Sequence, residues 1–368
     1  MLSGSALWIR LLFSIAVSLI ISFVFTPLVK SFAEKIGAMD IPKEARRVHD
    51  HPIPRMGGLA IFLGFLISVL LFADLTQQVK GTLIGAIIIV AIGAIDDIVN
   101  LKYWIKLIAQ LTAAGIAIFT GTEIHFFSLP LSSAGPVMVI LGALSIPITI
   151  IWIVGITNSV NLIDGLDGLA VGVSAISCIT MLAAALISPD ADINVAVILS
   201  CLVGACLGFM PYNINPAKIF MGDTGALMLG YILATVSVMG LFKFYALVSF
   251  AVPILALALP MADTLFAIVR RVLRGQNPMT PDRGHFHHRL LDMGMSQKQA
   301  VAVLYAVSAV LGLLAVSLAS KGILHIVVLI AACVIAVVAG IIIYCRSAKH
   351  RASEKHALPD TEENNGEN

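Results

Sequence analysis

Long apolar runs separated by short polar connections make up most of this chain of 368 residues. About 20 apolar residues in a helix span the roughly 30 Å hydrocarbon core of a bilayer, so the pattern predicts an all-α, polytopic integral membrane protein. The first run is longer than a signal-peptide core and no small-residue cleavage site follows it, so we interpret it as a membrane helix. The runs predict about 11 transmembrane helices, at about 7–28, 57–73, 81–95, 104–120, 137–157, 168–187, 195–211, 224–241, 244–268, 299–319 and 323–344.

Basic residues concentrate in alternate connections of this pattern. With the amino terminus outside, most of the 23 lysines and arginines fall in the connections after the first, third, seventh and ninth spans and in the carboxyl-terminal tail. The positive-inside rule places such segments in the cytoplasm. We therefore predict an outside N-terminus, a cytoplasmic C-terminus, one transmembrane domain and a polar, disordered cytoplasmic tail. The domain covers 1–345, with cytoplasmic loops at 30–56, 96–103, 158–167, 212–223 and 270–298, and the tail covers 346–368.

The composition supports the membrane assignment and excludes other classes. Hydrophobic residues make up 59% and charged residues 12% of the chain, and its mean hydropathy is +0.99, outside the range of soluble globular proteins. The formal net charge of +2 is too small to indicate a nucleic-acid-binding surface. The lipid bilayer is therefore an expected partner, and nucleic acid is not.

The most unusual polar stretch lies between the fifth and sixth predicted spans. Asn158, Asn161 and Asp164 recur every three residues, so they project from one side if the fifth span stays helical. Gly165 can then end that helix. Asp167 follows, and it either caps the sixth span or binds a ligand. Because polar groups beside hydrocarbon are costly unless they face partners or water, this stretch predicts a functional site.

Two adjacent carboxylates, Asp96 and Asp97, end the third predicted span, and Lys102 and Lys106 follow them. Carboxylates at the carboxyl end of a helix oppose the helix dipole. Acids in such a position are either solvated charges or bind a cation. The dipole favours the second interpretation, with a lysine or a metal ion as the cation.

The eighth predicted span opens on Phe220, Met221, Gly222 and Asp223. Asp223 either serves as the helix N-cap or binds a ligand, because the amino-terminal end of a helix also attracts anions. Phe220 either packs at the membrane interface or stacks on a base.

Histidine and arginine gather in the loop after the ninth span, at Arg283, His285, His287, His288 and Arg289. Neither cysteine nor a carboxylate pattern completes a zinc site there. Clustered arginine and histidine side chains suit a phosphate-rich ligand better.

Asp263 is the one carboxylate well within a predicted span, in a run that Pro253 and Pro260 are expected to kink. The kink frees backbone groups that need partners at membrane depth. Asp263 therefore either satisfies such groups or faces a cavity.

All of these groups except Asp263 lie at the predicted cytoplasmic ends of the spans. Carboxylates, amides and basic side chains on one membrane face are the groups needed to bind magnesium and phosphate together, because Mg²⁺ takes one or two carboxylates plus substrate oxygens and water. The chain has no Gly-rich nucleotide loop of the P-loop type. A phosphorylated ligand would therefore be held in another way, at the lipid boundary.

Four motifs together resemble those of the polyprenyl-phosphate N-acetylhexosamine-1-phosphate transferases, in glycosyltransferase family 4. They are the Asp96-Asp97 pair, the Asn-x-x-Asn-x-x-Asp-Gly-x-Asp-Gly-Leu-Ala stretch from Asn158, Phe-Met-Gly-Asp-Thr-Gly from Phe220, and His-Phe-His-His from His285. The resemblance runs from about 27 to 291 and is nearest to the bacterial branch that uses UDP-N-acetylglucosamine. The alternative is the branch that transfers phospho-N-acetylmuramoyl-pentapeptide in peptidoglycan synthesis.

The resemblance implies that undecaprenyl phosphate attacks the β-phosphorus of UDP-N-acetylglucosamine, giving undecaprenyl-diphosphate-N-acetylglucosamine and UMP. The transmembrane domain is then catalytic, and the product starts a cell-wall or surface polymer such as teichoic acid. The implied cofactor is Mg²⁺, with Mn²⁺ as a substitute, and the family suggests a homodimer. The implied metal ligands are Asn161 and Asp223; the implied catalytic residues are Asp96, Asp97, Asp223, His287 and His288; and the implied substrate-binding residues are Lys106, Asn158, Asp164, Asp167, Phe220, Arg283, His285 and Arg289.

The role of Asp96 stays open between general base, positioning group and covalent nucleophile. An acceptor phosphate monoester, with a second pKa of about 6, is already largely dianionic at neutral pH and needs little deprotonation. A function of another class, a membrane transporter, is suggested by the many spans and by Asp263. Transporters hold their coupling charges near the bilayer midplane, whereas most charges here lie at the ends of the spans.

Overall fold

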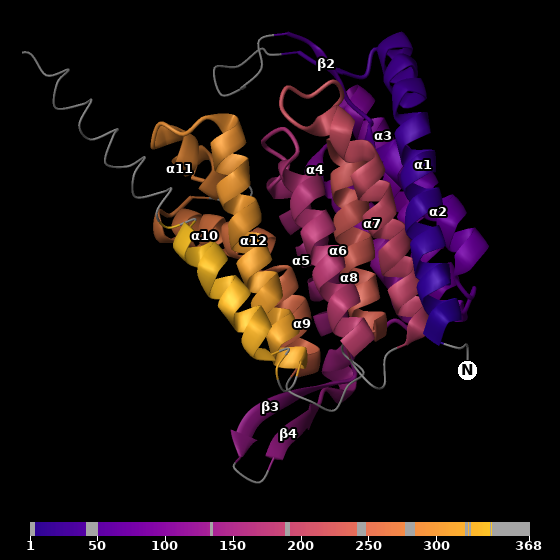
Figure 1. The fold of residues 1–368 in the computed structure, drawn as a ribbon. Coiled ribbons are helices and arrows are strands. Elements are labelled where there is room, and N and C mark those ends of the chain that lie inside the picture. The colour runs from indigo at the N-terminus through magenta and orange to yellow at the C-terminus, as the bar shows by residue number, and fades with distance from the viewer. Residues whose placement is uncertain are drawn as a thin grey trace, which may run out of the picture.

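The computed structural model describes residues 4–41, 51–132, 135–187, 192–240, 248–276, 284–320, 323, 325–338 and 340. Long helices run side by side as a bundle, with a β-hairpin projecting from one end and a short two-stranded ladder at the other (Figure 1). Among the described residues, seven helices are long and apolar enough to cross a membrane, and three shorter apolar helices accompany them. The prediction of a mainly helical, multi-pass membrane protein is confirmed, whereas the count of eleven spans and the orientation stay predictions.

The helices keep the order of the apolar runs but not all of their bounds. They are α1 (Gly4–Ile36), α2 (Gly58–Phe72), α3 (Gln77–Val99), α4 (Tyr103–Phe119), the 3₁₀ turn η1 (Gly142–Leu144), α5 (Ser145–Leu162), α6 (Leu169–Ile187), α7 (Ile193–Asn213), α8 (Gly222–Gly240), α9 (Val248–Ala256), α10 (Ala258–Leu273), α11 (Phe286–Asp292) and α12 (Gln297–Ala319). The strands are β1 (Met39–Asp40), β2 (Ile53–Pro54), β3 (Phe126–Ser132) and β4 (Gly135–Ile140).

Two predicted spans differ from the structure. The run at 137–157 begins as strand β4, which pairs antiparallel with β3, and helix α5 starts only at Ser145. A short apolar run does not by itself distinguish strand from helix. The run at 244–268 is divided between α9 and α10, which meet at Leu257, with Pro253 inside α9 and Pro260 in the first turn of α10. Proline removes a backbone donor, so the expected kink is a break between two helices.

Helix α8 lies at the centre of the bundle, and nearly all of its side chains are buried. It packs against α3 and α5, with further contacts to α2 and α6. Glycine allows the closest of these approaches, because a Cβ on Gly230 would lie 2.7 Å from Thr157 Cα. The buried position of α8 fixes where its amino-terminal end, and therefore Asp223, lies.

The β1–β2 ladder holds a segment of chain over that end of α8. Met39 pairs with Pro54 and Asp40 with Ile53. Phe220 N then donates to Pro54 O at 2.8 Å, and Gly57 N donates to Phe220 O at 2.9 Å. Gly58 N donates to Met221 O, also at 2.9 Å. The chain before α2 and the chain before α8 therefore support each other, and this brings Arg55 beside the end of α8.

Candidate active site

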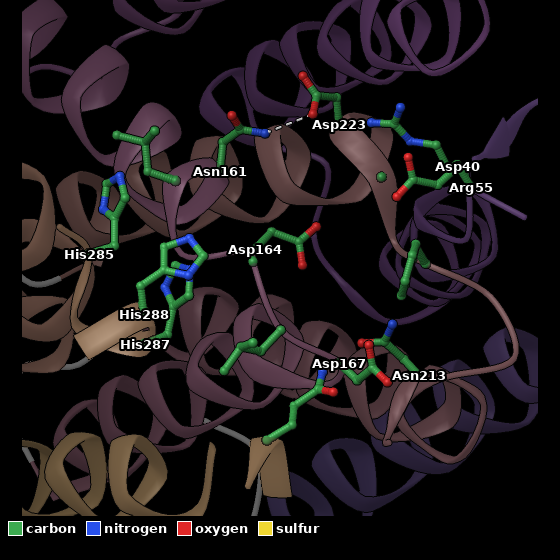
Figure 2. A pocket seen from close by; sticks show the side chains of 16 residues that line it. Asp40, Arg55, Asn161, Asp164, Asp167, Asn213, Asp223, His285, His287 and His288 are labelled. Carbon is green, nitrogen blue, oxygen red and sulfur yellow. Dashed lines mark hydrogen bonds between the residues drawn. The ribbon is translucent and has the colours of Figure 1, made fainter. Parts of the chain in front are cut away.

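A cavity of about 370 Å³ opens at the end of the bundle that carries the β1–β2 ladder, a volume typical of ligand sites. Figure 2 shows His285, His287 and His288 on one side of this cavity and Asp167 with Asn213 on another, with Asp164 between them. The lining residues are Asp40, Arg55, Asn161, Leu162, Asp164, Gly165, Leu166, Asp167, Asn213, Phe220, Gly222, Asp223, His285, His287, His288 and Gln297.

Four helices contribute to a charged cluster beside the cavity, and two of its members, Asn161 and Asp223, line the cavity. Lys106 Nζ, from α4, donates to Asp223 Oδ2 at 2.7 Å and to Asp96 Oδ2 at 3.1 Å. Asn161 Nδ2, from α5, donates to Asp223 Oδ1 at 3.1 Å, the bond drawn in Figure 2. Asp96 Oδ1 also accepts from Leu101 N at 2.6 Å. Residues separated by up to 127 positions in sequence therefore meet at the first turn of α8, as the predicted topology required.

Asp97 lies next to this cluster but does not line the cavity. It is buried, and its carboxylate accepts from Asp223 N at 2.9 Å, Thr224 N at 3.1 Å and Thr224 Oγ1 at 2.6 Å. Arg55 Nε lies 3.4 Å from the same carboxylate. A carboxylate that accepts the first N–H groups of a helix acts as its cap. Asp97 therefore caps α8 from a neighbouring helix and positions Asp223.

Glycine is needed at position 222 because of this cap. Gly222 has φ +69°, in the left-handed region that disfavours other residues. A Cβ there would also lie 2.3 Å from Asp97 Oδ2. The Phe-Met-Gly-Asp motif therefore encodes a helix start that another element caps. Asp223, which follows in the first helical turn, is left with its side chain in the cavity.

Asp164 does not lie on a helix with the two asparagines, which corrects the expectation that all three share one helical face. Helix α5 ends at Leu162, before Gly165, so Asp164 belongs to the turn that follows. Gly165 instead makes room for a histidine, because a Cβ there would lie 2.4 Å from His287 Nε2. The break in the helix turns Asp164 towards the middle of the cavity (Figure 2).

None of the described residues donates a hydrogen bond to the Asp164 carboxylate. Burial raises the pKa of Asp164 to about 8, and the negative charges of Asp223 and Asp97 add to the effect, while Arg55 opposes it. The group therefore holds a proton at neutral pH when the cavity contains no cation. A bound cation or a donor on a ligand would favour the ionised form.

Asp167 lies in the same turn, and its partners are on the loop before α8 rather than at the start of α6. Asp167 Oδ2 accepts from Asn215 Nδ2 at 2.9 Å and from Ala217 N at 3.0 Å. The adjacent Gly168 N donates to Asn213 Oδ1 at 3.2 Å. These bonds join the two loops, and Asp167 remains part of the cavity wall.

The histidine segment is held by Asp263. His285 Nδ1 lies 2.8 Å from Asp263 Oδ2, and Phe286 N donates to Asp263 Oδ1 at 2.8 Å. The sequence left two roles open for Asp263, and the structure fits the one in which its carboxylate accepts a hydrogen bond from a backbone N–H group. That N–H group belongs to α11, however, and not to the broken helix. Burial, with the charge of His288, lowers the pKa of His287 to about 4. His287 is therefore neutral near pH 7 and offers a hydrogen bond, not a fixed positive charge.

Two of the predicted substrate-binding residues, Asn158 and Arg289, lie elsewhere. Asn158 pairs with Gln110, donating to its Oε1 at 2.6 Å between α5 and α4, and it does not line the cavity. Arg289 lies on a separate hollow formed with residues of α10. Arg283 falls outside the residues that the structure describes. The α4–α5 contact explains the amide of Asn158 without a ligand.

The prediction missed four polar lining residues: Asp40, Arg55, Asn213 and Gln297. Arg55 and Asn213 lie outside the four motifs that carried the prediction. Asp40 and Gln297 belong to no motif that the sequence analysis used. They reach the cavity through the β1–β2 ladder and the start of α12, which hydropathy does not reveal.

Among the described residues, no group of three or more histidine, cysteine, aspartate or glutamate side chains is arranged to hold a metal ion. Asp223 and Asn161 nevertheless supply the hard oxygen ligands that Mg²⁺ prefers, and Mg²⁺ commonly completes its shell with substrate phosphate and water. Asn161 uses its N–H₂ group to contact Asp223, so its carbonyl oxygen is free of that contact. The pair therefore fits a metal that arrives with a phosphorylated ligand.

Comparison with known proteins finds clear relatives. A model of glycosyl transferase family 4 matches residues 79–241. A Bacillus subtilis protein named as a probable undecaprenyl-phosphate N-acetylglucosaminyl 1-phosphate transferase is 42% identical, over 85% of this chain and 86% of the relative. A Mycobacterium tuberculosis decaprenyl-phosphate N-acetylglucosaminephosphotransferase is 37% identical, over 78% of this chain and 77% of the relative. A Staphylococcus aureus phospho-N-acetylmuramoyl-pentapeptide-transferase is 31% identical, over 81% of this chain and 95% of the relative.

Replacing Asp164 should stabilise the protein most at high pH. Because the folded-state pKa of Asp164 is raised to about 8, the wild type loses stability as the pH rises from about 4 towards 8, whereas an asparagine does not titrate. The melting temperature of Asp164→Asn relative to wild type should therefore be a few degrees higher at pH 8 than at pH 5, in detergent with EDTA. Asp292→Asn, at an exposed carboxylate, is the matched control. An Asp164→Asn melting difference that is constant from pH 5 to pH 8 would contradict the raised pKa.

Proposed function

Since this chain belongs to the polyprenyl-phosphate N-acetylhexosamine-1-phosphate transferases of glycosyl transferase family 4, we propose that it transfers N-acetylglucosamine 1-phosphate from UDP-N-acetylglucosamine to undecaprenyl phosphate. The products are undecaprenyl-diphosphate-N-acetylglucosamine and UMP. The observation that carries the proposal is the hydrogen-bonded cluster of Asp96, Lys106, Asn161 and Asp223, in which Asn161 and Asp223 line the cavity. The N-acetylglucosaminyl relative at 42% identity favours this donor over the muramoyl-pentapeptide donor of the relative at 31%.

The donor diphosphate would lie against the first turn of α8. There Asp223 and Asn161 would hold Mg²⁺, or Mn²⁺ in its place, through oxygen atoms. When bound, the metal neutralises charge on the diphosphate. Lys106 supports this site because its ammonium already bridges Asp223 and Asp96, and a phosphate oxygen can take the place of one carboxylate. Phosphoryl transfer depends mainly on such positioning and charge neutralisation.

The acceptor phosphate would enter beside Asp96. Its oxygen attacks the β-phosphorus, the bond from that phosphorus to the bridging oxygen breaks, and UMP leaves. Both oxygens of Asp96 are already engaged, Oδ1 by Leu101 N and Oδ2 by Lys106. This arrangement favours a positioning role, in which Asp96 holds Lys106 towards the acceptor, over covalent attack. A dianionic acceptor needs no base to remove a proton.

The remaining lining residues divide between the two ends of the donor. Phe220 and Asp167, on the cavity wall with Asn213, would contact the nucleoside. His285, His287 and His288 would donate hydrogen bonds to phosphate or sugar oxygens, and Arg283 would add charge. Asp164, between the two groups (Figure 2), would ionise when the metal binds. Asp164 would then change from a protonated carboxyl group to a carboxylate that faces the cation.

We place this site on the cytoplasmic face of the cell membrane, because the lysines and arginines concentrate in the connections at that end. The product would begin a cell-wall or surface polymer such as teichoic acid. A homodimer is also proposed. Crosslinking in native membranes, with band sizes read on a denaturing gel, distinguishes it from a monomer.

Asp96→Asn should test the role of the acceptor-side carboxylate. If Asp96 positions Lys106, the variant should lose activity by at least about a hundredfold at every pH from 6 to 9, because a neutral amide cannot form an ion pair with the ammonium. If Asp96 is a general base, the loss should shrink at high pH, where the acceptor is fully ionised. UMP release from the purified protein measures the profile, and activity close to wild type throughout would contradict both roles.

A donor panel tests the proposed function itself. Purified protein with undecaprenyl phosphate and Mg²⁺ should release UMP from UDP-N-acetylglucosamine at least about tenfold faster than from its galacto epimer or from UDP-N-acetylmuramoyl-pentapeptide, since one epimeric hydroxyl changes the hydrogen bonds of a polar site. Asp223→Asn is the matched inactive control. UMP release mainly from the muramoyl donor would assign the chain to the other branch, and no release from any donor would refute the transferase proposal.

A further inference from the structure

A chain of hydrogen bonds joins three segments at the end of the cavity that holds Asp167. Asn215 Nδ2 donates to Asp167 Oδ2 at 2.9 Å and to Gln297 Oε1 at 2.7 Å. Asp167 belongs to the turn before α6, Asn215 to the loop before α8, and Gln297 is the first residue of α12. All three side chains are half-buried, and Asp167 and Gln297 line the cavity.

The order of donors and acceptors in this chain fixes the orientation of both amides. A carboxylate only accepts, so Asn215 must present its N–H₂ group to Asp167. The second N–H of the same group then needs an oxygen, which Gln297 supplies. Gln297 must therefore keep Nε2, with its two donors, at the end that faces away from Asn215.

Two polar groups of this series of hydrogen bonds have no partner among the described residues, and both lie at the cavity wall. Asp167 Oδ2 already accepts two hydrogen bonds, from Asn215 and Ala217, whereas Oδ1 accepts none from the described residues. Likewise, none of those residues accepts a hydrogen bond from Gln297 Nε2. The cavity therefore offers one acceptor from Asp167 and one donor group from Gln297 at the end where Asn213 also lies (Figure 2).

We propose that Gln297 is a specificity residue that reads the uracil ring together with Asp167. The inference rests on the proposed function, which supplies a uridine nucleotide as donor. Uracil carries an N3–H donor flanked by two carbonyl acceptors. The N3–H donates to Asp167 Oδ1, and a neighbouring carbonyl accepts from Gln297 Nε2. Cytosine has an acceptor at N3, which meets Asp167 with like polarity, and an amino group at C4, which also meets Gln297 with like polarity if Gln297 contacts the C4 carbonyl of uracil.

The alternative is that Gln297 only supports the structure of the turn before α6, because another residue of α12, Tyr305, already contacts that turn. Tyr305 donates its hydroxyl to Gly168 O at 2.5 Å. If Gln297 only holds Asn215 in place, the affinity for UMP depends on Gln297 Oε1 and not on Gln297 Nε2. Gln297→Glu keeps an oxygen for Asn215 and removes the donor, while Gln297→Met removes both without adding charge. The two roles therefore give different results in the same variants.

The test measures the affinity of nucleoside monophosphates for the purified full-length protein by calorimetry. The ligands are UMP, CMP, 2-thio-UMP and 4-thio-UMP, since sulfur accepts hydrogen bonds weakly. Wild type should prefer UMP to CMP by at least about tenfold and should lose roughly fivefold for the thio analogue at the carbonyl that Gln297 contacts. Gln297→Met and Gln297→Glu should bind UMP roughly five- to tenfold more weakly. Gln297→Met should also show no thio penalty.

Gln299→Ala is the matched control for effects on the helix. Gln299 accepts from Ser296 N in the capping box of α12 and does not line the cavity, so this variant should keep the UMP affinity and the thio penalty of wild type. If Gln297→Met keeps the thio penalty, or if Gln297→Glu binds UMP as wild type does, Gln297 only supports Asn215 and the inference is wrong.

Failure of the proposed function gives a different result. If wild type binds none of the four nucleotides and releases no UMP from UDP-N-acetylglucosamine, both the proposed function and the inference are refuted. If wild type turns over and prefers UMP while the Gln297 variants match it, only the inference falls. The melting temperature of each variant shows whether the fold is retained.

Discussion

The hydrogen bonds between Asp97 and the first turn of α8 are the interaction on which the site depends. A helix that begins inside a membrane protein has unpaired N–H groups, and these must find acceptors because lipid supplies none. Asp97 accepts two of them and the Thr224 hydroxyl as well. Since Arg55 lies beside the same carboxylate, the capping charge is itself compensated. The start of α8 is thereby fixed relative to α3 and to the segment that follows β2.

The fixed start of α8 makes a difficult electrostatic arrangement possible. Asp164 and Asp223 line one cavity and Asp96 lies beside them, and burial and mutual repulsion disfavour three negative charges there. Lys106 offsets the charges of Asp96 and Asp223, and Asp164 is left to hold a proton. A cation brought by a diphosphate would relieve the same repulsion. Under the proposed function, a metal and a phosphate together would therefore bind more readily than either alone.

Several parts of this arrangement could be predicted from the sequence. Hydropathy located most of the helices, and the alternation of basic connections placed Asp96, Lys106, Asn161 and Asp223 at one end of the bundle. The rest depends on tertiary contacts that leave no local pattern. The run at 137–157 begins as a strand because an apolar partner strand lies beside it. Asn158 faces Gln110, a residue of no motif, and Gln297 reaches the cavity only because α12 folds back over the turn at Asp167.

The central claim is that the cavity at the start of α8 binds a metal and a sugar nucleotide as one unit. Calorimetric titration of UDP-N-acetylglucosamine into the purified protein, with Mg²⁺ and with EDTA, tests it most directly. Wild type should bind at least about tenfold more tightly with Mg²⁺, and Asp223→Asn should lose that difference while keeping its melting temperature. Equal affinity with and without Mg²⁺ in wild type, or an unchanged Mg²⁺ effect in Asp223→Asn, would contradict the account.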